Sequence, residues 1–167
     1  MSLSSILTYL LFTLLLAFTL FNLYATFTSK KRKKISTISF QAKCKEIEDE
    51  LLKIQKQRKL NFSYIKRMAN DQDEVIILVK DLTNKVASIA MKDDTKTFLF
   101  SSFKGAKCLY EKANKKILSA KVEVTIEDDV FTYNFGTKPF RQNGIIGKVI
   151  IETCEEFVKA LNEIKEP

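Results

Sequence analysis

A run of five basic side chains is the densest charged cluster of this sequence and the one best suited to bind anions. It follows a stretch from Ser2 to Ser29 that holds no charged side chain. Each basic residue held beside a lipid surface contributes about 1 kcal/mol of attraction to acidic headgroups. We therefore predict that this run binds a membrane surface; its residues are Lys30, Lys31, Arg32, Lys33 and Lys34.

A glycine-containing loop near the C-terminus is the second candidate anion site. Gly144, Gly147 and Lys148 stand at the expected start of a helix, where free backbone N–H groups attract anions. The loop is not a P-loop, because the glycines are too close and Val149 stands where Ser or Thr should follow the lysine. A loop that only leads into the helix is the alternative. The predicted anion patch consists of Lys138, Arg141 and Lys148.

Residues suited to catalysis are scarce. The chain has no histidine, which removes the commonest general base and the commonest metal ligand. Cys44, Cys108 and Cys154 form no CxxC pair, so no zinc site is predicted and the thiols are expected to be structural. The acidic doublets Asp93–Asp94 and Asp128–Asp129 fall where turns are expected. We predict no enzyme, no cofactor and no metal; a membrane-anchored hydrolase using Asp93 or Asp128 with a perturbed lysine is an alternative.

The segment that must position the basic run is apolar. Residues Ile6 to Phe27 would form a helix about 33 Å long, enough to cross a hydrocarbon core of about 30 Å. A cleaved signal peptide is the alternative, but its apolar region should be shorter and should follow basic residues. Residues 1–29 are therefore predicted to be an uncleaved transmembrane anchor.

The position of the basic run also predicts an orientation. Cytoplasmic flanks of membrane spans carry an excess of Lys and Arg, and here all five basic side chains follow the span. We expect a single-pass protein of a bacterial inner membrane, with the N-terminus outside and the C-terminal domain in the cytoplasm. Asn22, Thr13 and Ala17 are residues through which two spans could pair, so a homodimer stays open.

Net charge alone suggests nucleic acid, but its distribution does not. The chain carries +8, yet residues 60–167 hold 17 basic and 16 acidic side chains. A nucleic-acid-binding protein concentrates its positive charge on the folded domain. We therefore predict no nucleic-acid partner.

Residues 30–59 are predicted to be a basic juxtamembrane segment followed by a connector helix. Apolar side chains at positions 40, 44, 47, 51 and 54 form a helical stripe, with Ser39 as the expected N-cap and residues 35–38 as a short linker. The stripe is expected to pack on the chain's own domain. A short coiled coil between two copies is the alternative.

Residues 60–167 are predicted to be an antiparallel meander closed by a helix. Alternating patterns and polar turns indicate strands near 61–68, 75–79, 85–91, 97–103, 106–111, 118–126 and 130–135. Residues 144–164 have apolar positions at 146, 150, 154, 157, 158, 161 and 164, which is typical of an amphipathic helix. The fold class is therefore α+β.

This order of elements resembles the pleckstrin-homology (PH) superfold. The segments IILVKDLTNKVASIAM, TKTFLFSSFKGAKCLYEKANKK, KVEVTIEDDVFTYNF and GKVIIETCEEFVKALNEI are similar to the PH-like domains of small, uncharacterised bacterial single-span membrane proteins, some of them carried by prophages or plasmids. The resemblance implies a PH-like β-barrel at residues 60–167 that binds a peptide, a protein or a lipid headgroup. It supplies no catalytic residues.

These inferences together predict a membrane-tethered cytoplasmic interaction module. Its domain would bind a protein segment or acidic lipid headgroups, with strand addition at an open sheet edge as the mode for a protein. A phage or plasmid exclusion protein that acts through its span is the alternative from another class.

Overall fold

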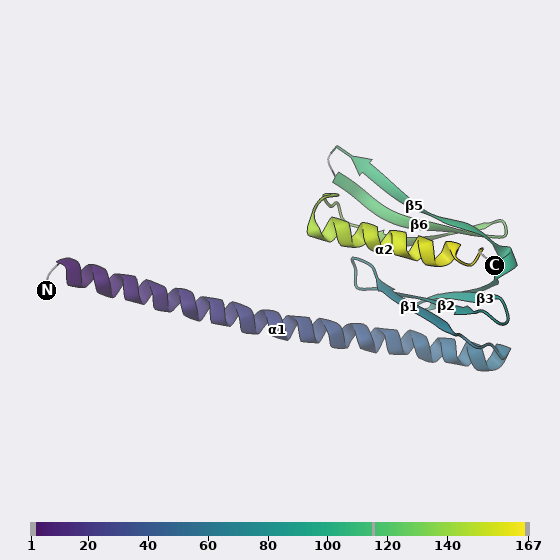
Figure 1. The fold of residues 1–167 in the computed structure, drawn as a ribbon, viewed down its shortest axis with the longest axis horizontal. Coiled ribbons are helices and arrows are strands. Elements are labelled where there is room, and N and C mark those ends of the chain that lie inside the picture. Colours follow the sequence, from purple (N-terminus) through teal and green to yellow (C-terminus); the bar gives the residue numbers. More distant parts are fainter. Residues whose placement is uncertain (1–2, 115, 166–167) are drawn as a thin grey trace. The chain divides into compact units, whose positions relative to one another are not determined.

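The computed structural model describes residues 3–114 and 116–165; within the long first helix it describes side chains at 10–26 and from 37 onward. Two units are distinguished, residues 1–42 and residues 43–167. The order of elements is one long helix, seven strands interrupted by a 3₁₀ turn, and a final helix (Figure 1).

Helix α1 runs from Leu3 to Arg58 without interruption. This corrects the predicted linker at 35–38 and the predicted separate connector helix, because neither Gly nor Pro occurs before Gly105 to break the helix. The hydroxyl of Thr19 donates to the carbonyl of Leu15 at 2.8 Å, so this polar side chain is satisfied within the helix. The helix ends at Lys59, which adopts a φ of 53°.

The structure contradicts the predicted membrane span. Among the residues that are described, no helix has the length and apolar character needed to cross a bilayer. The described side chains of the apolar part of α1 cover residues 10–26, where Thr13, Thr19, Asn22 and Thr26 interrupt the apolar sequence. The transmembrane anchor at 1–29, the single-pass topology and the inner-membrane location are corrected accordingly.

Four strands form sheet A in the order β1-β2-β3-β4, each antiparallel to its neighbour. Left-handed residues at Asp73, Lys85 and Asp93 close its three hairpins, with φ of 59°, 54° and 62°. Every residue of β2 is buried, which means that both faces of the sheet are covered. The strands are β1 (Tyr64–Ala69), β2 (Val75–Asp81), β3 (Val86–Met91) and β4 (Asp94–Leu99).

Three strands form sheet B in the order β5-β6-β7, after the 3₁₀ turn Phe100–Ser102. They are β5 (Phe103–Ala113), β6 (Lys116–Ile126) and β7 (Asp129–Gly136). Each of the seven predicted strands corresponds to one of the observed strands. The predicted closed barrel is wrong: in the described part of the chain the two sheets are separate, because no strand of one is paired with a strand of the other.

Helix α2 (Ile145–Asn162) packs against both sheets and completes the main core. Phe157 is fully buried and meets the ring of Tyr133 edge-on, with centroids 5.8 Å apart, and the ring of Phe135 at 5.5 Å. Figure 1 shows α2 between β1 on one side and β5 and β6 on the other. An ion pair of 3.0 Å joins Lys66 of β1 to Glu156 of α2.

The last turns of α1 cover the other face of sheet A. Cys44, Ile47 and Leu51 are buried at helical spacing. They face the second set of alternate β2 side chains, since even-numbered β2 residues such as Ile76 belong to the main core. Lys43 donates to the carbonyl of Asp73 at 2.7 Å, which fixes this segment beside the β1–β2 turn. The second unit therefore begins inside α1, at Lys43.

A buried carboxylate holds the β2–β3 turn to the end of α1. The side chain of Asp81 is inaccessible to solvent and accepts hydrogen bonds from the backbone N–H groups of Asn61, Thr83 and Asn84 and from the Asn84 side chain. These bonds favour the charged form and lower the pKa of Asp81 to about 2.

Replacing Asp81 by Asn should therefore destabilise the fold near neutral pH, because an amide nitrogen would face donors that now meet a carboxylate oxygen. The folded-state pKa lies below the ordinary value of 3.8, so the contribution of Asp81 is complete above that value and is lost as the pH falls towards 2. Urea unfolding of both proteins across this range should show the stability difference shrinking. A difference that stays constant down to about pH 2 would contradict this role.

Candidate functional site

The loop that leads into α2 is fixed by main-chain contacts. Phe140 is buried and exchanges two backbone hydrogen bonds of 2.9 Å with Ile117, while the N–H of Gly144 donates to the carbonyl of Arg141 at 3.0 Å. Gly147 lies against the same carbonyl, where a Cβ atom would be only 2.1 Å from the oxygen. Only glycine allows the backbone at this position to lie so close to the Arg141 carbonyl. This supports the alternative in which the glycines serve the loop that leads into the helix rather than an anion site.

The predicted anion patch is present as three exposed basic residues around this loop. Among the described residues, none of the three takes part in an ion pair. The backbone N–H of Lys138 donates to the Asp71 carboxylate at 3.2 Å, and Lys148 follows Gly147 in the first turn of α2. The residues are Lys138, Arg141 and Lys148.

An apolar cavity of about 300 Å³ lies between the first turns of α2 and the end of β1, and none of the three basic residues lines it. Buried Phe135 and Ile150 form part of its wall, and Asp71 stands at its edge. The apolar side chains at its mouth are left largely in solvent: Ile145 is 86% exposed, Ile146 70% and Val149 56%. Ile146, one of the apolar positions of the predicted amphipathic helix, is therefore not part of its buried face.

The free edge of β5 is the second surface of interest. The Asn162 side chain accepts from the N–H of Ala106 at 3.2 Å and donates to its carbonyl at 3.3 Å, as a neighbouring strand would. The ammonium of Lys165 donates to the carbonyl of Lys104. The first part of this edge is thus closed by the C-terminal end of α2.

Beyond Ala106 the same edge is open. Backbone groups alternate in direction along an antiparallel strand, and the register with β6 is regular from Gly105 to Glu111. Because Ala106 faces away from β6, the N–H and C=O groups of Cys108 and Tyr110 do so as well. Within the described part of the chain, no hydrogen bond to these four groups is formed.

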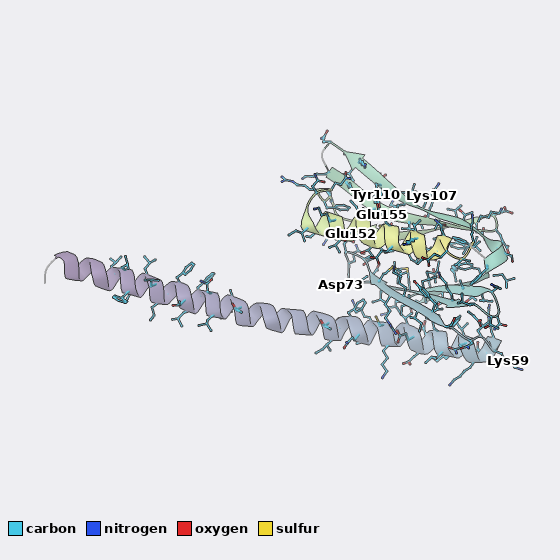
Figure 2. The ribbon with its side chains drawn as sticks, viewed as in Figure 1. Lys59, Asp73, Lys107, Tyr110, Glu152 and Glu155 are labelled. Atoms are coloured by element: carbon cyan, nitrogen blue, oxygen red, sulfur yellow. The ribbon has the colours of Figure 1, made fainter. Side chains whose placement is uncertain are left out.

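The side chains beneath the open edge form a mostly apolar cluster. Cys108, Tyr110 and Ile151 are half-buried against the main core. Burial raises the pKa of the Cys108 thiol and of the Tyr110 phenol, whose hydroxyl is shielded from solvent. Glu155 of α2 lies close enough to Tyr110 to contribute to the raised pKa of the phenol; both residues are labelled in Figure 2.

The cysteines have the character expected of structural residues. Burial raises the pKa of the Cys154 thiol to about 12 and also raises that of the buried Cys44. Since the thiolate is the nucleophilic form, little of either thiol is reactive at neutral pH.

The other candidate site residues that the structure describes do not lie close to one another. The side chains of Lys30 to Lys34 lie outside the described residues. Asp93 lies in the β3–β4 turn, whereas Asp128 lies in the β6–β7 turn and pairs with Lys104 at 2.7 Å. The lysine with a pKa lowered by burial is Lys80, which pairs with Glu163 at 3.4 Å. The convergence of Asp93 or Asp128 with a perturbed lysine, on which the hydrolase alternative depends, does not occur among these residues.

Replacing Gly147 by Ala should destabilise the protein by about 1–3 kcal/mol, because the new methyl group would displace the Arg141 carbonyl and the Phe140 ring. Chemical unfolding measures the loss. Lys148→Ala is the control: the neighbouring side chain is exposed, and its removal should change stability by no more than about 0.5 kcal/mol. Equal stability of the two variants would exclude the proposed close approach.

The chain matches no protein-family model, no curated protein and no solved structure. The resemblance to PH-like domains therefore stays a prediction.

Proposed function

We propose that this chain is a protein-interaction module whose β5 edge takes up an extended segment of a partner protein as an additional strand. The observation that carries the proposal is the divided edge of β5. Asn162 already occupies the strand-pairing groups of Ala106, and the corresponding groups of Cys108 and Tyr110 have no partner among the residues that the structure describes. Main-chain hydrogen bonds give affinity in this mode of recognition, and alternate side chains give specificity.

The free edges of β1 and β7 are less suited to this role. On β1, Lys66 forms an ion pair with Glu156 of α2, and Arg67 forms one with Glu48 of α1. A helix is therefore held against each face of this strand. On β7, the β1–β2 turn closes the end of the strand, because the N–H of Asp71 donates to the carbonyl of Phe135 at 3.0 Å.

Strand β4 is protected in another way. It is only six residues long and carries Asp94 and Lys96, and short charged strands resist pairing with other chains. Strand β5 has 11 residues, and its open part lies over an apolar cluster. Of the four edges, β5 therefore offers the best combination of unpaired backbone and adjacent apolar surface.

The geometry also suggests the kind of segment that would fit. A strand paired with Cys108 and Tyr110 would form up to four backbone hydrogen bonds, each contributing about 0.5–1.5 kcal/mol net. Every second side chain would point towards α2, where Ile151 offers apolar contact and Glu155 a negative charge. An extended segment with an apolar residue followed by a basic one suits this surface.

Proline substitutions distinguish the two sides of β5. Cys108→Pro removes an N–H that points to the open edge, whereas Lys107→Pro removes one that pairs with β6. Since proline is tolerated at outward-facing edge positions, Cys108→Pro should unfold at nearly the wild-type urea concentration and Lys107→Pro well below it. A similar drop in the urea concentration of unfolding in both variants would contradict the assignment of the Cys108 N–H to the open edge and of the Lys107 N–H to β6.

The same variant tests the function. Peptides selected from a randomised display library on the full chain should bind the folded Cys108→Pro protein at least about tenfold more weakly, as expected for the loss of 1.4 kcal/mol. Leu109→Ala is the matched control, because it shortens a side chain on the other face and keeps every edge N–H. Selected peptides that bind wild type and Cys108→Pro equally would rule out strand addition at β5.

A further inference from the structure

We propose that the partner at the β5 edge is a second copy of this chain, which pairs its own β5 antiparallel to the first about a two-fold axis at Leu109. This pairing rests on the proposed function, because it uses the same open backbone groups. The open part of the edge has defined ends: Asn162 occupies Ala106 on one side, and the regular pairing with β6 ends after Glu111 on the other. Residues 107–111 are therefore the segment that can take up a strand, and Leu109 is its midpoint.

Symmetric pairing about Leu109 gives every open backbone group a partner. Two copies related by a two-fold axis use the same surface, and their identical strand edges run antiparallel. With Leu109 opposite Leu109 of the second copy, Cys108 lies opposite Tyr110 of the second copy, and the two residues exchange both of their backbone hydrogen bonds. The symmetry repeats this exchange, so the contact contains four hydrogen bonds and leaves none of these groups open.

The two neighbouring symmetric registers fit less well. A register centred on Cys108 requires the backbone groups of Ala106, which the end of α2 already occupies. A register centred on Tyr110 requires Lys112, which lies beyond the regular part of the strand. In both of them a charged side chain of one copy would also lie opposite Leu109 of the other.

The outer face of β5 carries charges that complement themselves in the register centred on Leu109. Lys107, Leu109 and Glu111 alternate on this exposed face. Lys107 of each copy would lie opposite Glu111 of the other, so two cross-strand pairs of opposite charge flank a contact between the leucines. Lys107 also pairs with Glu123 of β6 at 2.9 Å, yet its side chain is still 67% exposed. Each ammonium group would thus lie between two carboxylates, which favours a second copy as the partner.

The concentration dependence of the full chain tests for this dimer. The contact is small, so association should be weak. Analytical ultracentrifugation from the low micromolar range to about 1 mM should show a monomer that becomes a dimer. Amide exchange at Cys108 and Tyr110 should be fast in the dilute monomer and slow as the dimer forms, whereas Ala106 stays protected throughout. A chain that is monomeric at every concentration, or a dimer in which these two amides still exchange fast, would overturn the proposal.

Exchanging the charges tests the register. Lys107→Glu and Glu111→Lys each place like charges opposite each other at both ends of the contact, so each variant alone should dimerise several-fold more weakly than wild type. An equimolar mixture of the two variants should form a mixed dimer with about wild-type affinity, because opposite charges then meet at both positions. Mixing would not restore association through another surface. Variants that dimerise as wild type does, or a mixture no stronger than its components, would exclude this register.

A disulfide between the copies tests the position of the axis. Opposed residues of a non-hydrogen-bonded pair have Cα atoms about 4.5 Å apart, within the range of about 4.4–6.8 Å that a disulfide spans. Leu109→Cys should therefore form a disulfide between copies when oxidised glutathione is added. Leu118→Cys is the matched control, since both leucines are 40% exposed and Leu118 lies on β6, away from the edge. Equal cross-linking of the two variants would contradict an axis at Leu109.

Failure of the dimer and failure of the proposed function give different results. Cys108→Pro removes an N–H that both use, so it should weaken peptide binding and dimerisation alike. If selected peptides bind wild type but not Cys108→Pro while the full chain stays monomeric, strand addition stands and the second copy is excluded as the partner. If the peptides bind both proteins equally, strand addition at β5 and the dimer are excluded together.

Discussion

The packing of Phe157 in the core that both sheets share is the contact on which the rest of this structure depends. Neither sheet is closed, and each exposes one apolar face unless α2 covers it. Phe157 meets two aromatic rings of β7, while Cys154 and Leu161 extend the same buried stripe along the helix. Burial of side chains of this size contributes about 1.5–3 kcal/mol each. The position of α2 is therefore determined by the core.

Because α2 is fixed in this way, it also determines which of the surfaces next to it stay open. Its C-terminal end brings Asn162 to β5 and closes the edge only as far as Ala106. Its first turn, held by Gly147 against the Arg141 carbonyl, leaves Ile146 in solvent above a cavity. A single packed helix thus decides where the sheet edge is open and where apolar surface is exposed.

The strands and α2 could be predicted because side-chain periods of 2 and 3.6 are local properties of the sequence. Whether the strands close into a barrel could not be predicted. Closure depends on whether strands far apart in the sequence pair with each other, and local side-chain patterns carry no information on that pairing. The role of Asn162 depends on a contact with a residue 56 positions away. The break predicted at 35–38 is absent because Ile, Ser and Thr are all compatible with a helix and no Gly or Pro stands there to interrupt it. The exposure of Ile146 follows from the loop around Arg141, which the helical pattern does not reveal.

Strand β5 has a closed part and an open part on the same edge. Native-state amide hydrogen exchange of the free protein measures this residue by residue. Slow exchange is predicted at Ala106, which is bonded to Asn162, and at Lys107 and Leu109, which face β6; fast exchange is predicted at Cys108 and Tyr110. Protection of Cys108 and Tyr110 equal to that of Lys107 and Leu109 would contradict the account.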